Sequence, residues 1–212
     1  MFTGLIQKVC TVKSLSSAAG GSVLTIELQN LAEQAKIGDS IAVNGVCLTI
    51  AKLTGKLAAF DLSGETLAKT NLGKLSAGSK VNIELSLKAD DRFGGHFVLG
   101  HIDGTATIKK IEKKGDFATF IFSAPKHLLE QLIPRGSVAI DGISLTVAEL
   151  NADAFTAAVI PQTIKETTLG TAKIGQTVNI EIDIITKTVK KHLENVLPHN
   201  NLTVDELRQQ GF

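Results

Sequence analysis

The chain has 212 residues, of which 43% are hydrophobic and 20% charged, and this globular composition excludes an extensively disordered protein. The formal net charge is +1 without a basic block, so nucleic acid is not an expected partner. No run of about 18 apolar residues is present, so no membrane span is expected. With two cysteines and no visible signal peptide, we expect a cytoplasmic protein without a disulfide framework or a metal site.

In chain order, the first half contains short segments rich in β-branched residues that end at turns, a pattern typical of closely spaced antiparallel strands. One or two helical turns are expected at residues 31–35, and again at 127–132 in the second half. Asn44-Gly45 and Asp141-Gly142 predict hairpin turns that require positive φ. The predicted strands of the first half are residues 22–27, 40–43, 47–50 and 80–84.

The two halves of the chain repeat each other. The segment SIAVNGVCLT at residues 40–49 matches SVAIDGISLT at 137–146, a shift of 97 positions (137 minus 40). The same shift carries VNIE at 81–84 onto VNIE at 178–181. A unit of roughly 95 residues is too long for a solenoid repeat and has the size of a small domain. The polar, glycine-bearing run at 89–95 is the expected linker.

This duplicated frame predicts an all-β fold of two tandem antiparallel barrels, because closure of a barrel removes exposed strand edges. We expect an N-terminal barrel at residues 1–96, a C-terminal barrel at 97–186 and a helical oligomerisation segment at 187–212. Apolar residues at helical spacing predict a helix at 186–197 and a short second one at 202–207. A terminal helix outside both repeats has no barrel to enter, so its apolar stripe is expected to meet another subunit.

Eight motifs, in order on this frame, give the chain a resemblance to the riboflavin synthase family of lumazine-binding-repeat enzymes. The resemblance covers essentially the whole chain. It implies two six-stranded antiparallel Greek-key barrels plus a C-terminal α-helix, and a homotrimer held by these helices. It also implies active sites between the N-terminal barrel of one subunit and the C-terminal barrel of its neighbour. The motifs are MFTGLI at 1–6, NGVCLT at 44–49, ET at 65–66, TNLG at 70–73, GGHF at 94–97, GHI at 100–102, DGISLT at 141–146 and VNIEID at 178–183.

The reaction implied by the resemblance is a dismutation. One 6,7-dimethyl-8-ribityllumazine gives a four-carbon unit to a second, forming riboflavin and 5-amino-6-(D-ribitylamino)uracil, with two substrate molecules in each site. No metal, flavin or nicotinamide cofactor is implied, and an association with lumazine synthase is left open. Duplication suits this chemistry, because two copies of one molecule need two like pockets. Proximity then supplies effective molarities of roughly 10⁵ to 10⁸ M.

The resemblance also implies where the substrates bind. Glycines let the backbone reach a polar ring, and short hydroxyls suit a polyol tail. In the first barrel the expected contacts are Gly4, Leu5, Ile6, Cys47, Leu48, Thr49, Asp61, Leu62, Ser63, Gly64, Glu65 and Thr66. In the second barrel they are Gly100, His101, Ile102, Ser144, Leu145, Thr146, Ala158, Val159, Ile160, Pro161, Gln162 and Thr163. The set is completed by Phe2, Thr3 and Arg135, the last at a position where the family usually has Lys.

The two halves differ at positions expected to divide the roles of donor and acceptor. His101 stands opposite Leu5, and Ser144 stands opposite Cys47. An imidazole, with an ordinary pKa of about 6.5, can take and return protons at neutral pH. A thiol or hydroxyl can add to the ring or bond a developing anion, and two aspartates are expected to orient groups at the barrel mouth. The candidate catalytic residues are His101, Cys47, Ser144, Thr146, Asp183 and Asp141.

Structural alternatives stand beside these roles. Cys47 also fits a small buried hydrophobe, His101 a core histidine, and Asp183 a helix cap. Two departures from the family pattern bear on binding, because Gln162 stands where Glu is usual and Leu99 where a polar residue is common. The chain has no Trp or Tyr, so aromatic stacking on a ligand is expected from Phe2, Phe60 or Phe97.

Two other functions compete with the enzyme. The serious alternative is a non-catalytic lumazine- or flavin-binding protein of the same fold. Such proteins tend to lose polar residues from one pocket, whereas this chain keeps hydroxyls in both halves. A tandem-barrel adaptor has less support, since the pocket motifs recur in both halves without a large apolar surface stripe.

Overall fold

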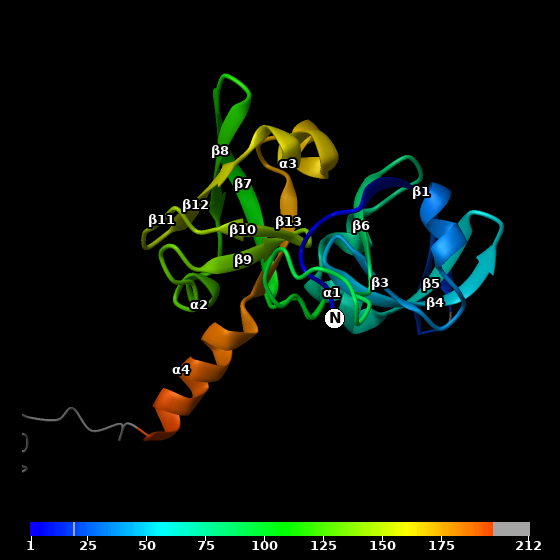
Figure 1. Cartoon of the computed structure of the whole chain (residues 1–212), viewed down its shortest axis with the longest axis horizontal. Coiled ribbons are helices and arrows are strands. Elements are labelled where there is room, and N and C mark those ends of the chain that lie inside the picture. The colour runs from blue at the N-terminus through cyan, green and yellow to red at the C-terminus, as the bar shows by residue number, and fades with distance from the viewer. Residues whose placement is uncertain (19, 197–212) are drawn as a thin grey trace, which may run out of the picture.

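The computed structural model describes residues 1–18 and 20–196, with side chains through residue 193, and folds into two β-barrels that lie side by side (Figure 1). The first barrel is closed, with antiparallel strands in the order β1-β2-β5-β4-β3-β6. This order is a Greek key, since the chain crosses from β2 to β3 without pairing them. Its strands are β1 Lys8–Ala18, β2 Gly21–Glu27, β3 Ser40–Val43, β4 Val46–Thr54, β5 Leu57–Ser63 and β6 Lys80–Leu85.

The second barrel repeats this order with one strand broken in two. Its sheet runs β10-β9-β13-β7-β8-β12-β11, so β10 and β11 together hold the place of β4. In the first barrel β4 stays continuous through a register shift between Ile50 and Lys52. The expectation of two tandem antiparallel barrels is therefore confirmed, with the second opened at this break. Its strands are β7 Gly104–Lys114, β8 Phe117–Ser123, β9 Ser137–Ile140, β10 Ile143–Thr146, β11 Glu149–Leu150, β12 Ala154–Val159 and β13 Thr177–Ile182.

Each barrel encloses its own apolar core. In the second barrel Phe122 stacks on Phe120 and Phe155, with ring centroids 6.0 and 5.1 Å apart. Fully burying one such side chain contributes ~1.5–3 kcal/mol. Because successive strand residues point to opposite faces, the residues between the core positions face outward. The candidate site is built on these outward faces.

Short helices connect the strands. The helical turns expected at 31–35 and 127–132 correspond to η1 and α2. Helices α1 and α3 were not predicted. The first is capped by Ser63, whose Oγ accepts from the Thr66 N–H (3.1 Å), and the second begins at Pro161. The helices are η1 Gln29–Gln34, α1 Gly64–Lys69, η2 Asn71–Lys74, α2 Lys126–Leu129, α3 Pro161–Glu166, η3 Thr168–Thr171 and α4 Ile184–Val196.

A buried polar network joins the two barrels about a local twofold relationship. Asn82 Oδ1 accepts from the Thr168 N–H (2.9 Å), and Asn179 Oδ1 accepts from the Asn71 N–H (2.7 Å). Both asparagines are 0% exposed. Leaving one such group unpaired costs ~1–3 kcal/mol, so the network fixes how the barrels meet. Its residues, in repeat-related pairs, are Asn44 and Asp141, Asn71 and Thr168, and Asn82 and Asn179.

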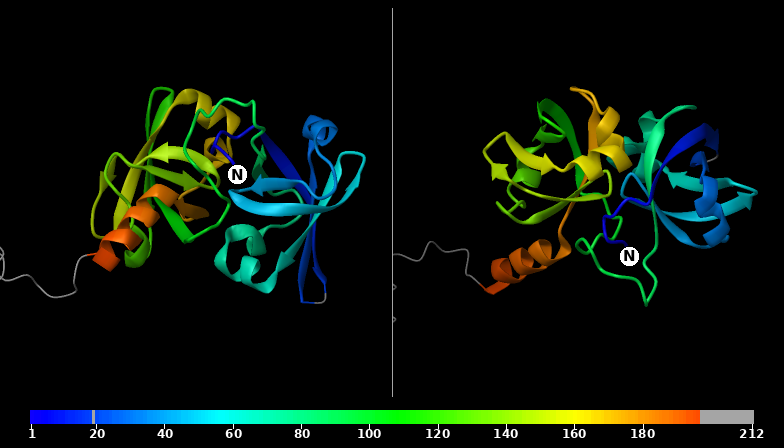
Figure 2. Two further views of the ribbon diagram at one scale, coloured as in Figure 1. Left: turned by 60° about the horizontal axis from the view of Figure 1, so that its bottom comes forward. Right: turned by 45° about the horizontal axis from the view of Figure 1, so that its top comes forward.

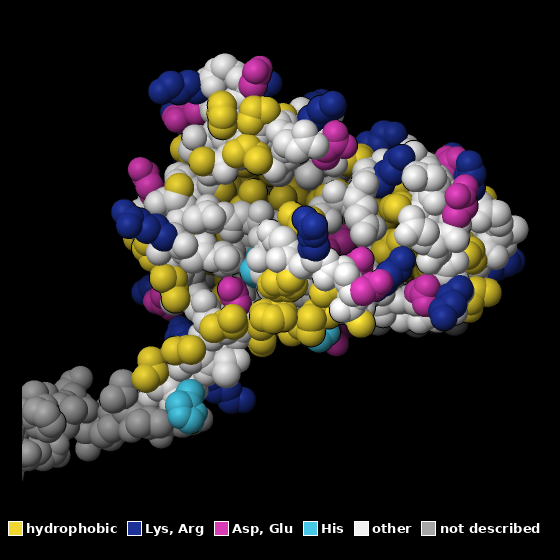
Figure 3. All heavy atoms as spheres, viewed as in Figure 1, with side chains coloured by type: hydrophobic (Ala, Val, Ile, Leu, Met, Phe, Trp, Pro, Cys, Tyr) yellow, Lys and Arg dark blue, Asp and Glu magenta, His cyan; other side chains and the backbone are white. Residues whose placement is uncertain are grey.

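Helix α4 projects away from the second barrel (Figures 1 and 2). Its base is held by an ion pair between Lys187 Nζ and Asp103 Oδ2 (2.9 Å), and the Asp183 Oδ1 accepts from the Ile185 N–H (2.9 Å). Ile185, Val189 and Leu193 form an exposed apolar stripe, 56%, 53% and 49% exposed, along the helix (Figure 3). The expected helix at 186–197 is thus present as α4. The second one, at 202–207, lies outside the described residues.

One predicted domain limit falls in a connecting segment and the other falls inside a helix. The division after residue 96 lies in the segment between β6 and β7, and the division at 187 lies inside α4, since Asp183 caps the helix earlier. None of the helices in the described part of the chain combines the length and apolar character needed to cross a bilayer.

Candidate active site

Two extended segments run between the barrels, and we call them the first strap (residues 3–6) and the second strap (residues 99–102). Buried carboxylates hold both. Glu84 on β6 accepts from the N–H groups of Thr3 (2.7 Å) and Gly4 (3.0 Å). Glu181 on β13 accepts from Leu99 (2.7 Å) and Gly100 (2.9 Å) in the same way. Figure 2 shows both segments between the barrels, the first in dark blue and the second in green.

Burial raises the pKa of both carboxyl groups, that of Glu181 to about 6, while the N–H groups they accept from offset part of the rise. Thr3 adds a hydroxyl bond to Glu84 (2.7 Å). Leu99 has no hydroxyl for Glu181, so this departure from the family pattern removes one bond and keeps the two backbone bonds. The buried carboxylates on β6 and β13 therefore anchor the two straps through their backbone N–H groups.

The straps exchange barrels. The Ser144 N–H on β10 donates to the carbonyl of Gly4 (2.8 Å), and the Cys47 N–H on β4 donates to the carbonyl of Gly100 (3.0 Å). Ile6 packs on the core of the second barrel, and Ile102 on the core of the first. The expected pairing of each strap with the strands of its own half is wrong. The structure combines residues 4–6 with Ser144–Thr146, and 100–102 with Cys47–Thr49.

Glycine is required at the crossing points. Gly4 and Gly100 have φ of +78° and +83°, and a Cβ on either would lie within 2.6 Å of the Cβ of Ser144 or Cys47. Each crossing brings backbone amide groups next to a thiol or a hydroxyl. We use the names Cys47 groove and Ser144 groove for the two candidate substrate-binding surfaces around these crossings. The first consists of residues 47–49, 61–66 and 100–102, and the second of residues 144–146, 158–163 and 4–6.

Only some of the expected contact residues turn their side chains toward these grooves. Cys47 and Ser144 are half-buried on the outward faces of their strands, and Thr49 and Thr146 are exposed beside them. The intervening leucines and the valine of β12 point into the cores and can offer a ligand only backbone atoms. These inward residues are Leu48, Leu62, Leu145 and Val159.

The far wall of each groove is the start of a helix. In the Cys47 groove Asp61, Ser63 and Glu65 are exposed, and a hydrogen bond and ion pair with Lys69 lower the pKa of Glu65. In the Ser144 groove the matching wall is largely uncharged. It consists of Ala158, Ile160, Pro161, Gln162 and Thr163, of which the alanine, isoleucine and glutamine are exposed. The two grooves thus have equivalent backbone arrangements, but the side chains of their walls differ in polarity.

A histidine that the sequence analysis left without a role contacts Ser144. His96 Nδ1 lies 2.7 Å from Ser144 Oγ, and its backbone N–H donates to the carbonyl of Thr3 (3.1 Å). Its side chain is buried, and burial lowers the pKa of the imidazole, an effect partly offset by the carboxylate of Asp183. Its place in the GGHF motif was the available signal, but only the fold brings it to β10.

The comparisons with known proteins agree with this geometry. The family model described as "Lumazine binding domain" matches residues 3–86 and again residues 99–183, so each match begins at a strap. The riboflavin synthase of Bacillus subtilis (strain 168) is 42% identical over 215 positions, with 100% of both chains covered. That of Actinobacillus pleuropneumoniae is 40% identical with the same coverage, and that of Escherichia coli (strain K12) 39% with 93% of each covered.

The chain belongs to the riboflavin synthase family. Among solved structures, LumP complexed with 6,7-dimethyl-8-(1'-D-ribityl) lumazine matches with a TM-score of 0.78 and 27% identity, covering 86% of this chain and 99% of LumP. LumP has also been solved with riboflavin, at a TM-score of 0.79.

The remaining residues expected from the riboflavin synthase family lie in different places. His101 is exposed on the second strap beside the Cys47 groove. Asp183 lies at the start of α4, where it caps the helix, and its negative charge raises the pKa of His96 against the effect of burial. Asp141 is 1% exposed, and its Oδ1 accepts from the Asn179 N–H (2.7 Å). Its expected position at a barrel mouth is wrong, because the local twofold axis buries it between the barrels.

The phenylalanines expected to stack on a ligand are mostly in the core. Phe2 is buried between the barrels against Ala42, Val98 and Ala139, and Phe60 lies inside the first barrel. Phe97 is exposed and pairs with Phe93 at 4.6 Å between centroids. Phe2 therefore packs in the apolar contact between the barrels, next to the first strap. Of the three phenylalanines, Phe97 is the one whose side chain is exposed to solvent.

Arg135 adopts a backbone conformation that side chains rarely take. Its φ is +66°, whereas its repeat equivalent in the first barrel is Gly38, with φ +90°. The two N–H groups donate to equivalent carbonyls, those of Val147 (2.7 Å) and Ile50 (2.9 Å). Arg135 therefore holds a strained backbone conformation that glycine relieves in the first barrel, and its side chain is exposed.

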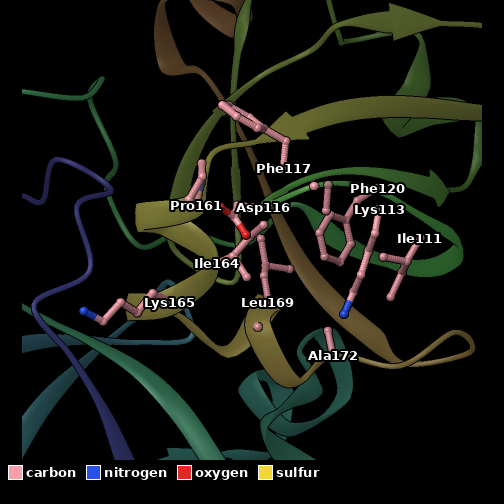
Figure 4. Close-up of a pocket in the computed structure, with 13 residues that line it drawn as sticks. Ile111, Lys113, Asp116, Phe117, Phe120, Pro161, Ile164, Lys165, Leu169 and Ala172 are labelled. Carbon is pink, nitrogen blue, oxygen red and sulfur yellow. The ribbon is translucent and has the colours of Figure 1, made fainter.

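Behind α1 and α3 lie two repeat-related clefts, of about 640 and 340 Å³. The second is formed by the β7–β8 hairpin and α3, with Ile111, Phe120 and Leu169 in its wall (Figure 4). Cys47 and Ser144 line neither cleft. Across residues 1–18 and 20–196 no group of three or more His, Cys, Asp or Glu side chains is arranged to hold a metal ion.

Proposed function

We propose that the chain catalyses the riboflavin synthase reaction, which converts two molecules of 6,7-dimethyl-8-ribityllumazine into riboflavin and 5-amino-6-(D-ribitylamino)uracil. The observation that carries this proposal is the pair of repeat-related grooves, each with backbone amides beside a thiol or hydroxyl. A reaction between two copies of one molecule needs two binding sites of like shape. Their unequal walls supply the difference that separates a donor from an acceptor.

We propose that the active site is completed between subunits of a homotrimer. Thr49 and Thr146 leave both grooves open to solvent in one chain, and a reactive ring needs a closed environment. Facing the Cys47 groove of one subunit with the Ser144 groove of its neighbour closes both. The apolar stripe of α4 supports such an assembly, since 49–56% of each of its three side chains is exposed in a single chain.

The residues with proposed direct roles are the ones whose polar atoms reach the grooves. Cys47 and Ser144 act on the rings, as nucleophiles or as hydrogen-bond donors to a developing anion. His101 exchanges protons at the Cys47 groove, and Thr49, Ser63, Glu65, Thr146 and Thr163 hold the polyol tails. Arg135 lies outside both grooves as defined, and the family resemblance implies that it brings a fixed positive charge to a ligand.

The test of the activity is a mixture of the purified protein with 6,7-dimethyl-8-ribityllumazine, followed by absorbance and product chromatography. Formation of riboflavin and the diaminouracil in equal amounts supports the proposal. A stable lumazine complex without product would replace it with the alternative function, a non-catalytic lumazine-binding protein of the fold in which LumP was solved with this ligand. No spectral change would remove both.

The test of the shared site is complementation between two exposed substitutions, Thr49→Arg and Thr146→Arg. Each blocks one groove, so each pure variant should be inactive. After co-refolding, random assembly should restore about a quarter of the wild-type activity if the site joins two subunits. Inactivity of the mixed assemblies, with each variant folded and trimeric, would contradict a site between subunits.

A further inference from the structure

The hydrogen bond between His96 and Ser144 is the contact of the Ser144 groove that the proposed roles leave unused. The Oγ–Nδ1 distance is 2.7 Å, and Ser144 is held from the other side by its N–H bond to Gly4. His96 comes from the segment before the second strap, so three separate parts of the chain fix this pair. A pair held so firmly at a groove has the geometry of an acid–base unit.

The other nitrogen of His96 is buried without a hydrogen-bond partner among the described residues. His96 is 7% exposed, and Asp183 is the charged group that acts on it. In the proposed arrangement the neutral ring carries its hydrogen on Nε2. Nδ1 is then a lone pair that accepts from the Ser144 hydroxyl, which leaves the oxygen lone pairs free for a ligand. A buried nitrogen without a hydrogen-bond partner destabilises the fold, and such a cost is often retained at functional sites.

We propose that His96 is a positioning residue and proton acceptor for Ser144 in the Ser144 groove. This inference rests on the proposed function, and it divides the two grooves chemically. In the first barrel the equivalent of Ser144 is Cys47, a free and half-buried cysteine. The Ser144 groove thus has a base hydrogen-bonded to its hydroxyl, whereas His101 at the Cys47 groove is exposed. The lumazine bound at the Ser144 groove is the one that loses a methyl proton.

The proton transfer balances without any added reagent. One C–H bond of an acidic ring methyl breaks, and its electron pair delocalises into the heterocycle. The proton passes to Ser144 Oγ while the Oγ–H proton passes to His96 Nδ1, which gives a neutral hydroxyl and an imidazolium next to Asp183. The same path returns a proton when the four-carbon unit is transferred.

The deciding variant is His96→Asn, because an asparagine side-chain atom reaches the position of Nδ1 and holds the hydroxyl but cannot take its proton. We expect kcat to fall about 100-fold with KM within about threefold of wild type, the usual size of a general acid–base contribution. Deuterium uptake into the ring methyl of bound lumazine should slow by the same factor. His127→Asn, at an exposed position on α2, is the matched control and should leave both rates unchanged.

A double variant separates a pair from two independent residues. If His96 acts through Ser144, adding His96→Asn to Ser144→Ala should cost nothing further. Unchanged kcat and methyl exchange in His96→Asn, or a full further loss in the double variant, would overturn the inference.

The tautomer of His96 can be measured in the wild type, so the test does not depend on whether a variant folds. Nitrogen NMR of labelled protein should show His96 with hydrogen on Nε2 and none on Nδ1, and Ser144→Ala should shift the Nδ1 signal. The opposite tautomer would overturn the inference. Absence of riboflavin formation by the wild type would instead refute the proposed function, and the methyl exchange would still decide the role of His96.

Discussion

The carbonyl of Gly100 accepts a hydrogen bond from the N–H of Cys47 at 3.0 Å, although the two residues belong to different halves of the repeat. Gly4 and Ser144 form the same contact at 2.8 Å. Because each strap completes a groove on the other barrel, neither barrel has a whole groove by itself. The grooves and the contact between the barrels therefore form together.

Replacing Gly100 with Ala should damage the Cys47 groove by more than backbone strain. The new Cβ would lie 2.3 Å from the Cβ of Cys47, at φ +83°. We expect a loss of about 2–4 kcal/mol in the free energy of unfolding, since strain and overpacking add, with weaker lumazine binding. Gly78→Ala is the control, because its φ is +90° and nothing lies within 4 Å of its Cβ. The Gly78→Ala variant should lose only about 1 kcal/mol in the free energy of unfolding. If urea unfolding gave equal losses for the two variants, the close packing of Gly100 on Cys47 would be contradicted.

Replacing Asp141 with Asn should stabilise the protein at neutral and alkaline pH. Burial raises the pKa of Asp141 to about 7, above its ordinary value of 3.8, so ionisation in the folded state is unfavourable. The unfolded chain releases this proton first, and wild-type stability falls as pH rises from 3.8 to about 7. Asn keeps an oxygen for the Asn179 N–H, as its repeat equivalent Asn44 does for Asn82.

The gain in unfolding free energy of Asp141→Asn should therefore grow between about pH 4 and pH 7 and then stay level. Urea unfolding across this range measures it, and Asp116→Asn, at an exposed position, is the control that should show no such trend. A loss of stability at pH 8 would show instead that the ionised carboxylate is needed at the interface.

The sequence could predict the barrels because their signals are local. The repeat at 40–49 and 137–146, the turn dipeptides and the β-branched strands each depend on neighbouring residues, and the structure has all three. The hydroxyl-bearing contact residues came from the family resemblance, and strand alternation in the structure places Thr49 and Thr146 on outward faces. These signals say which segments fold and which side chains face outward.

The exchange of the straps could not be predicted in this way. Residues 4–6 and 100–102 have a similar pattern, so either could dock on either barrel. The arrangement depends on how the barrels meet, where Asn82 and Asn179 form bonds across the contact. The His96–Ser144 pair depends on the same crossing. Asp141 was misjudged because a polar residue in a turn is usually exposed, whereas a second barrel covers this turn.

Replacing Arg135 with Gly should stabilise the fold and weaken substrate binding. Glycine relaxes the φ of +66°, as Gly38 does in the first barrel, and we expect a gain of about 0.5–1 kcal/mol. Removing the guanidinium should raise KM roughly tenfold, the loss of one exposed charged contact. Arg135→Lys separates the effects, since it keeps charge and strain. A Gly variant with unchanged KM would remove Arg135 from the substrate site.

Replacing Val189 with Glu should separate the subunits without unfolding the barrels. The side chain is 53% exposed, so the new carboxylate meets no core, but in the proposed homotrimer it would lie in an apolar contact. We expect sedimentation to show monomers, circular dichroism to keep the β signal, and riboflavin formation to fall at least 100-fold, because each groove loses its partner. Thr188→Glu, one residue along on an exposed face, carries the same charge and should remain trimeric and active. A fully active Val189→Glu monomer would mean that one chain contains the whole site.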